Sequence, residues 1–161
     1  MYAMTQERWK ALVQGEGCPF CGERSDESEF WSKVTTLSVS TLYLHKFQTY
    51  RGYAVLVFDP RHVTRPGELD ATEWTSFCAD LHLAQAAVER VTKPTHMNLA
   101  SLGNQVPHLH WHIIPRYEDG VRWGGPIWTT SEAEMEIRHL SDEEHRGLVS
   151  AIRAECVALT R

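Results

Sequence analysis

Three histidines alternate with apolar residues in the stretch from Val106 to Arg116. The order is His108, Leu109, His110, Trp111, His112, Ile113. Because successive side chains of a β-strand point to opposite faces, this spacing predicts a strand with one histidine face and one apolar face. Imidazole can ligate a metal ion, carry a proton near neutral pH, or attack as a nucleophile when it is neutral. The less specific interpretation is a histidine-rich solvent face or an adventitious metal patch.

Neutral amide side chains precede this stretch. Asn98, Asn104 and Gln105 each carry an amide, and Gly103 permits a close backbone approach. Neutral donors that face a row of imidazoles could hold a phosphate ester while the imidazoles supply the chemistry. For each amide taken alone, ordinary turn formation is the simpler interpretation.

A second group of possible ligands is spread along the chain. Cys18 and Cys21 form a Cys-x-x-Cys turn, and His62 follows an apolar stretch over residues 52–58. Together with one histidine of the row, these residues could form a tetrahedral Zn²⁺ site. Alternatively, the cysteines are a redox pair or two small buried residues, and His62 is a surface or capping histidine.

The composition is that of an ordinary globular protein. The 161 residues are 42% hydrophobic and 23% charged, with a formal net charge of -5. We therefore expect a single domain over residues 1–161, without the basic field that recruits nucleic acid. No apolar stretch is long enough to cross a membrane, and residues 1–13 lack the apolar core of a signal peptide. Four cysteines without a disulfide-type pattern fit reduced thiols, so we expect a cytoplasmic protein.

Periodicity and capping signals predict the remaining elements. Capping boxes at 70–73 and 141–144 should each open a helix, and Pro94 should end the first of them. The expected order is a helix at 5–14, strand character over 34–45, a strand at 52–58, a helix to 92, strands at 95–100 and 106–116, and a C-terminal helix at 141–160. Residues 117–130 are rich in Gly and Trp, with Trp123 and Trp128 around Gly124-Gly125-Pro126. This order predicts an α+β fold with a mostly antiparallel sheet.

At this point the sequence resembles the histidine triad (HIT) family of nucleotide hydrolases and transferases. The run from His108 to Ile114 looks like the family signature. The Cys18–Cys21 turn, the strand that leads to His62, Asn98 and the Gly103-Asn104 pair fall where HIT proteins place comparable elements. The resemblance covers residues 15–130.

The resemblance implies a five-stranded antiparallel sheet with a long helix packed on it, N- and C-terminal helices, and a homodimer with a continuous sheet. It implies that His110 attacks the α-phosphate of a nucleotide to form a nucleotidyl-histidine. His112 would contact the phosphate or assist the leaving group, and Asn98, Asn104 and Gln105 would hold phosphate oxygens. It also implies a structural zinc ion, with Cys18, Cys21, His62 and His108 as its ligands.

Two departures leave the substrate open. Many HIT proteins contact ribose through an acidic or amide residue where this chain reads Lys46-Phe47-Gln48, and the tail at 124–128 resembles a bacterial subgroup. The expected substrate is a dinucleoside polyphosphate such as a diadenosine polyphosphate, a nucleotide phosphoramidate, or a similar nucleotide. The alternatives are a nucleotide-binding regulatory protein with little turnover, and a protein in which the histidine row is itself the metal site.

Overall fold

The computed structural model describes residues 4–129 and 139–161. A five-stranded sheet forms its centre, in the order β1-β2-β3-β5-β4, and every neighbouring pair is antiparallel. The strands are β1 (Trp31–Thr36), β2 (Ser40–His45), β3 (Ala54–Phe58), β4 (His96–Ala100) and β5 (His110–Arg116). The predicted α+β fold with an antiparallel sheet is confirmed.

The helices begin and end close to the predicted signals. They are α1 (Gln6–Val13), α2 (Ala71–Thr92) and α3 (Asp142–Leu159), with short 3-10 turns η1 (Pro66–Glu68) and η2 (Ile127–Thr129). Capping boxes formed by Asp70 with Glu73, and by Ser141 with Glu144, open α2 and α3. Within the described residues, no helix is both long enough and apolar enough to cross a bilayer.

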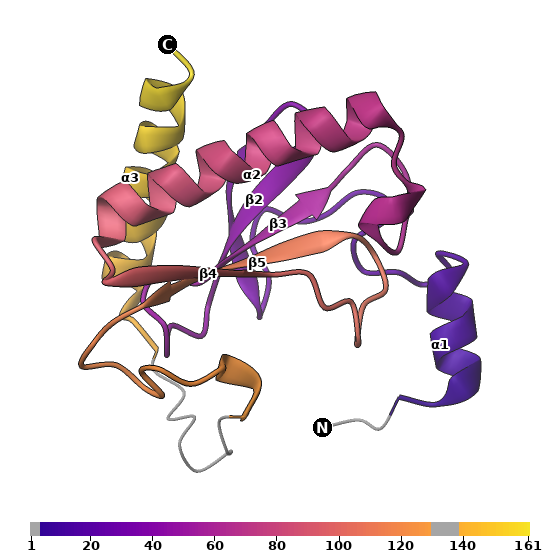
Figure 1. The fold of residues 1–161 in the computed structure, drawn as a ribbon, viewed down its shortest axis with the longest axis horizontal. Coiled ribbons are helices and arrows are strands. Elements are labelled where there is room, and N and C mark those ends of the chain that lie inside the picture. Colours follow the sequence, from indigo (N-terminus) through magenta and orange to yellow (C-terminus); the bar gives the residue numbers. More distant parts are fainter. Residues whose placement is uncertain (1–3, 130–138) are drawn as a thin grey trace.

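The two faces of the sheet are covered differently (Figure 1). The long helix α2 lies across one face and contacts α3, which also packs against β1. Between these helices and the sheet lies the main core, which includes Leu56, Phe77, Ile113 and Ile152. A smaller apolar cluster on the other face joins the N-terminal segment to β2 and β3, through Leu12, Phe20, Tyr43 and Val57 among others. The histidine face of β5 therefore looks toward the N-terminal segment.

The stretch over 34–45 is two strands rather than one. The chain reverses at Leu37 to Val39, where Asp80 of α2 accepts hydrogen bonds from both the backbone and the side chain of Ser38, and also from the Val39 N–H and the Ser40 hydroxyl. This carboxylate is 5% exposed. A turn held by a side chain 40 residues away carries no local Gly, Pro or Asn signal, which is why the sequence pattern did not separate the strands.

The histidine strand is shorter than predicted, because β5 begins at His110. Val55 and Val57 of β3 lie opposite His112 and His110, and Ala100 of β4 lies on the other side of His112. His108 precedes the strand, and the backbone N–H of the next residue donates to the carbonyl of Val63 (2.7 Å). The row of three histidines is thus divided between a loop position and a strand.

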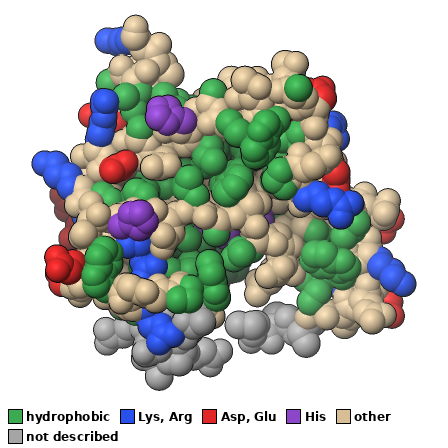
Figure 2. All heavy atoms as spheres, in the orientation of Figure 1, with side chains coloured by type: hydrophobic (Ala, Val, Ile, Leu, Met, Phe, Trp, Pro, Cys, Tyr) green, Lys and Arg blue, Asp and Glu red, His purple; other side chains and the backbone are tan. Residues whose placement is uncertain are grey.

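In the space-filling view, hydrophobic side chains run across the middle of the displayed face, whereas most charged side chains lie toward its edges (Figure 2).

Candidate functional site

A compact Cys₂His₂ cluster forms at the start of the histidine row. The side-chain ligand atoms of Cys18, Cys21, His62 and His108 all lie within 4.8 Å of one another. The Nδ1 atom of His108 is 3.5 Å from each sulfur, and the Nδ1 atom of His62 is 3.3 Å from the Cys21 sulfur. The structure therefore brings together all four residues that were predicted as metal ligands.

Backbone carbonyls fix both imidazoles of this cluster in the same tautomer. The Nε2–H of His108 donates to the carbonyl of Phe58 (2.7 Å), and the Nε2–H of His62 donates to the carbonyl of Val13 (3.2 Å). Each ring consequently aims the lone pair of its Nδ1 at the sulfurs. Burial, as the largest cause, lowers the pKa of His108 to about 4, so this ring is neutral at pH 7.

The cluster has the donor set of a structural zinc site. Two sulfurs and two bare imidazole nitrogens are a tetrahedral Zn²⁺ set, and each imidazole has the carbonyl partner that orients such ligands. Burial, together with the neighbouring Cys18, raises the pKa of the Cys21 thiol to about 11. A bound cation would reverse this effect, because metal binding stabilises the thiolate.

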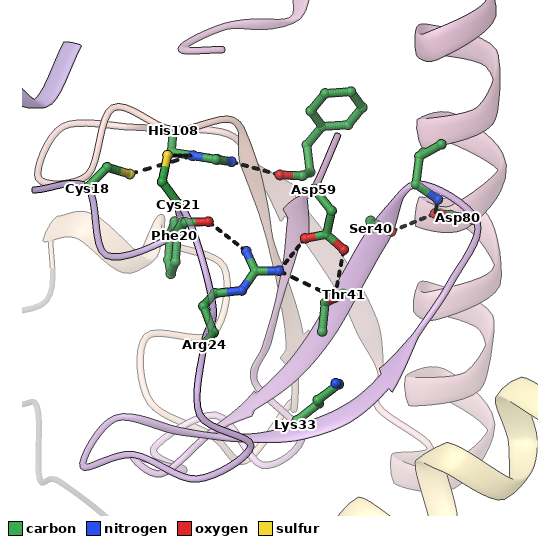
Figure 3. Close-up of polar contacts among 12 residues, drawn as sticks. Cys18, Phe20, Cys21, Arg24, Lys33, Ser40, Thr41, Asp59, Asp80 and His108 are labelled. Carbon is green, nitrogen blue, oxygen red and sulfur yellow. Dashed lines mark hydrogen bonds and ion pairs between the residues drawn. The ribbon is translucent and has the colours of Figure 1, made fainter. Parts of the chain in front are cut away.

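Arg24 ties the Cys-x-x-Cys turn to the sheet (Figure 3). Its guanidinium donates to the carbonyl of Phe20 (2.9 Å) and pairs with Asp59, whose other carboxylate oxygen accepts from the hydroxyl of Thr41 (2.7 Å). Figure 3 also shows Cys18 and Cys21 directed at the ring of His108. The other ring nitrogen of His108 donates to the carbonyl of Phe58. Arg24 and Asp59 therefore anchor the turn that carries the two thiols to β2 and to the end of β3.

The next histidine has the opposite arrangement of ring nitrogens. The Nδ1–H of His110 donates to the carbonyl of His108 (2.5 Å), which leaves the lone pair on Nε2. That Nε2 lies 3.1 Å from the Nε2 of His112. His110 is 6% exposed, and burial lowers its pKa. A neutral imidazole with one nitrogen fixed and the other directed into a pocket has the form of a nucleophile.

The third histidine contacts a tyrosine. The Nδ1 of His112 lies 2.7 Å from the hydroxyl of Tyr53, and the Tyr53 ring stacks on the ring of His45, with centroids 5.1 Å apart and planes 12° apart. Burial is the main cause that lowers the pKa values of His112 and His45 to about 4 and raises the pKa of Tyr53 to about 12.

His110 and His112 line a pocket of about 510 Å³. Its lining includes an aromatic wall of Phe20, Phe30 and Trp31, and the loop from Leu102 to Val106. None of the described residues that line this pocket is Asp, Glu, Lys or Arg. A phosphate bound here would therefore meet imidazoles and neutral amides, and an apolar ring could lie against the aromatic wall.

Of the predicted substrate-binding residues, Asn104, Gln105 and His112 line this pocket and Asn98 does not. Asn98 lies on β4, where its side-chain oxygen accepts from Arg116 (2.7 Å), and it lines a separate hollow of about 360 Å³ beside Trp123 and Trp128. This hollow includes part of the Gly- and Trp-rich stretch over residues 117–130; Thr130, its last residue, lies outside the described residues.

Sequence reasoning missed Tyr53, His45 and the aromatic wall as parts of the site. The sequence held a partial signal. Tyr43 and His45 are two residues apart, as are Tyr53 and Val55, and residues at this spacing in a strand point to the same face. The pairing of Val55 with both Tyr43 and His112 places these residues on the histidine face. The strand order needed for this inference is not visible in the sequence.

Comparison with known families agrees with this geometry. The model of the HIT domain family matches residues 32–119, more than half of the chain. The chain belongs to the HIT domain family. No curated protein matches it.

Solved HIT structures share the fold at low sequence identity. A histidine triad protein from Bradyrhizobium japonicum is 24% identical, with a TM-score of 0.73 over 84% of this chain and 97% of its own. A HIT protein from Sinorhizobium meliloti is 24% identical, with a TM-score of 0.70 over 78% and 89% of the two chains. A Zn-bound histidine triad family protein from Mycobacterium smegmatis is 14% identical, with a TM-score of 0.56 over 94% of each chain.

Proposed function

We propose that this protein is a nucleotide hydrolase or nucleotidyl transferase in which His110 attacks the α-phosphate of the substrate. The observation that carries the proposal is the orientation of His110. A backbone carbonyl holds its Nδ1–H, and its Nε2 faces the pocket that His112 and the amide loop also line.

The proposed reaction has two displacements at phosphorus. In the first, the lone pair of His110 Nε2 forms the N–P bond while the bond from phosphorus to the leaving oxygen or nitrogen breaks, and the leaving group takes that electron pair and a proton from the solvent. In the second, water or another acceptor attacks the same phosphorus and loses a proton to the solvent, and the N–P bond breaks with its electron pair returning to His110 Nε2. Hydrolysis releases a nucleoside monophosphate and restores neutral His110.

The pocket suggests how a nucleotide would be oriented. Phe20, Phe30 and Trp31 would contact the base, since base–aromatic stacking contributes about 1–3 kcal/mol per base. Asn104, Gln105 and the Nε2–H of His112 would hold the phosphoryl oxygens. Where many HIT proteins contact ribose, Gln48 is 1% exposed, and its amide bonds the backbone of His45, Gly52 and Tyr53. We therefore expect no ribose contact from Gln48.

Zinc is part of the proposal as a structural ion. Cys18, Cys21, His62 and His108 would hold it, and it would fix the segment immediately before β5. In this role the ion would contribute folding energy and would take no part in the displacement at phosphorus.

We also propose a homodimer with a continuous antiparallel sheet. β4 is an edge strand of the described sheet; Leu99 on this strand and Leu102 just after it are 38% and 46% exposed. An exposed edge with apolar side chains favours pairing with another strand. Sedimentation at micromolar protein tests this proposal, and a monomer under those conditions would refute it.

A turnover screen tests the proposed activity. Adenine and guanine nucleotides with phosphate, phosphoramidate and nucleotide leaving groups should be compared as substrates. Protein quenched in alkali during turnover should be digested, and the masses of its peptides should be measured by mass spectrometry. We expect a nucleoside monophosphate product and a nucleotidyl mass on the peptide that contains His110. Nucleotide binding without turnover would instead favour a regulatory protein, and an adduct on another residue would exclude His110 as the nucleophile.

A further inference from the structure

We propose that Tyr53 is the positioning residue of His112: its hydroxyl fixes the imidazole tautomer that directs an Nε2–H, rather than a lone pair, at the substrate phosphate. The inference rests on the proposed function for its catalytic consequence. The tautomer itself is a property of the protein alone.

A backbone carbonyl sets the direction of every hydrogen bond in this chain of contacts. The carbonyl of His108 can only accept, so His110 must donate through Nδ1–H and a neutral ring then has no proton on Nε2. The contact of 3.1 Å between the two Nε2 atoms needs one proton, which must therefore lie on His112. Neutral His112 is left with a bare Nδ1, so the Tyr53 hydroxyl is the donor across 2.7 Å.

Tyr53 is well placed to impose this arrangement. Its backbone N–H donates to the carbonyl of Tyr50 (2.8 Å), and its own carbonyl accepts from the backbone N–H of His45 (3.0 Å) and from the side chain of Gln48 (3.2 Å). The ring is stacked on His45. With backbone and ring both held, the hydroxyl has little freedom to leave His112. Burial raises the pKa of Tyr53 to about 12, so the hydroxyl keeps its proton at neutral pH.

The tautomer determines what His112 offers to a phosphate. A phosphate between the two histidines would separate their Nε2 atoms and free the lone pair of His110 for attack. In the fixed tautomer, His112 then donates to a phosphoryl oxygen, where negative charge is stabilised by a preorganised donor. In the other tautomer, a nitrogen lone pair would face the same oxygen and repel it.

The test is the Tyr53→Phe variant, with Tyr50→Phe as the matched control. Tyr50 lies three residues away, and its ring lies under the Arg116 guanidinium, 5.4 Å from it. Imidazole ¹⁵N spectra of each protein would report which nitrogen of His112 carries the proton. Thermal unfolding would show that each variant is folded, and kcat and KM would be measured on the best substrate of the screen.

We expect wild type and Tyr50→Phe to show a bare Nδ1 and a protonated Nε2 on His112. Tyr53→Phe should show a mixture of tautomers, with kcat lowered about 10- to 100-fold and KM changed less than about threefold. A His112 spectrum that is unchanged in folded Tyr53→Phe overturns the inference, as does a wild-type His112 with its proton on Nδ1. An unchanged kcat overturns the catalytic consequence. If the wild type turns over no nucleotide, the proposed function fails, while the spectra still decide the tautomer.

Discussion

His108 and His110 are two residues apart, yet their rings are used in opposite ways. In His108 the Nε2–H donates a hydrogen bond to a backbone carbonyl, so Nδ1 carries no proton and faces two thiols. In His110 the Nδ1–H donates a hydrogen bond to a backbone carbonyl, so Nε2 carries no proton and faces a pocket. The same side chain thus becomes a candidate metal ligand or a candidate nucleophile according to which ring nitrogen the backbone occupies.

The two regions share one residue. The ring of His108 belongs to the Cys₂His₂ cluster, while its carbonyl holds His110. Disturbing the cluster should therefore reach the pocket through the backbone, whereas changing His110 should leave the cluster intact. This asymmetry can be tested by changing one region and measuring both.

The largest expected effect is on the pocket side. His110→Asn should lower turnover by at least about 1,000-fold, because the other two pocket histidines, His45 and His112, accept hydrogen bonds at Nδ1 and so carry a proton, not a lone pair, on Nε2. Zinc content and thermal stability should stay at their wild-type values. The measurements are steady-state turnover, metal analysis and thermal unfolding, with His82→Asn on the exposed side of α2 as the control. Retained turnover would remove His110 from the proposed mechanism.

Breaking the cluster should affect both regions. Cys18→Ser or Cys21→Ser should remove the bound zinc and, with it, about 3 kcal/mol or more of unfolding free energy, because a ligand that binds only the folded state stabilises it by mass action. Turnover should fall by about tenfold as the His108 carbonyl loses its support. Cys78→Ser, on α2 and outside the cluster, should match the wild type. Unchanged metal content and stability in the Cys18 and Cys21 variants would refute the site.

The aromatic wall should control affinity more than rate. Trp31→Ala should raise KM about 5- to 150-fold, from the loss of about 1–3 kcal/mol of stacking, and should change kcat much less. Trp74→Ala removes an indole that is 39% exposed on α2 and should change neither constant. A Trp31→Ala variant with unchanged KM would show that the base binds elsewhere.

The pH dependence of stability tests whether the pocket histidines are neutral in the folded protein. Burial is the main cause that lowers the pKa values of His45 and His112 to about 4 in the folded protein, against about 6.5 in the unfolded chain. Between these values the unfolded chain binds more protons. The unfolding free energy should therefore fall as the pH drops from 6.5 to 4, by about 1 kcal/mol per pH unit for each histidine.

Urea unfolding at several pH values measures this slope. His45→Gln should give a shallower slope than the wild type, and His82→Gln, which alters an exposed histidine, should give the same slope. An unfolding free energy that is constant from pH 6.5 to 4 would contradict the assignment of buried neutral histidines.

The sequence alone predicted the elements whose signals are local. Period-two alternation identified the histidine strand, and the capping boxes at Asp70 and Ser141 located the starts of two helices. The Cys-x-x-Cys turn and the histidines also have a recognisable chemistry, so the candidate ligand types could be named before their positions were known. Local signals suffice here because caps and alternation act within a few residues.

Only the tertiary structure decided how these residues are used. Cys18 and His108 are 90 positions apart, and their meeting depends on the N-terminal segment packing against the sheet. The turn between β1 and β2 is held by Asp80 from a distant helix, and Tyr53 reaches His112 only because β3 pairs with β5. The position of each imidazole proton depends on carbonyls and hydroxyls supplied by the fold. Apart from the contact of His110 with the His108 carbonyl, which spans two residues, these are long-range hydrogen bonds, and residue spacing carries no information about which distant partner a ring nitrogen will meet.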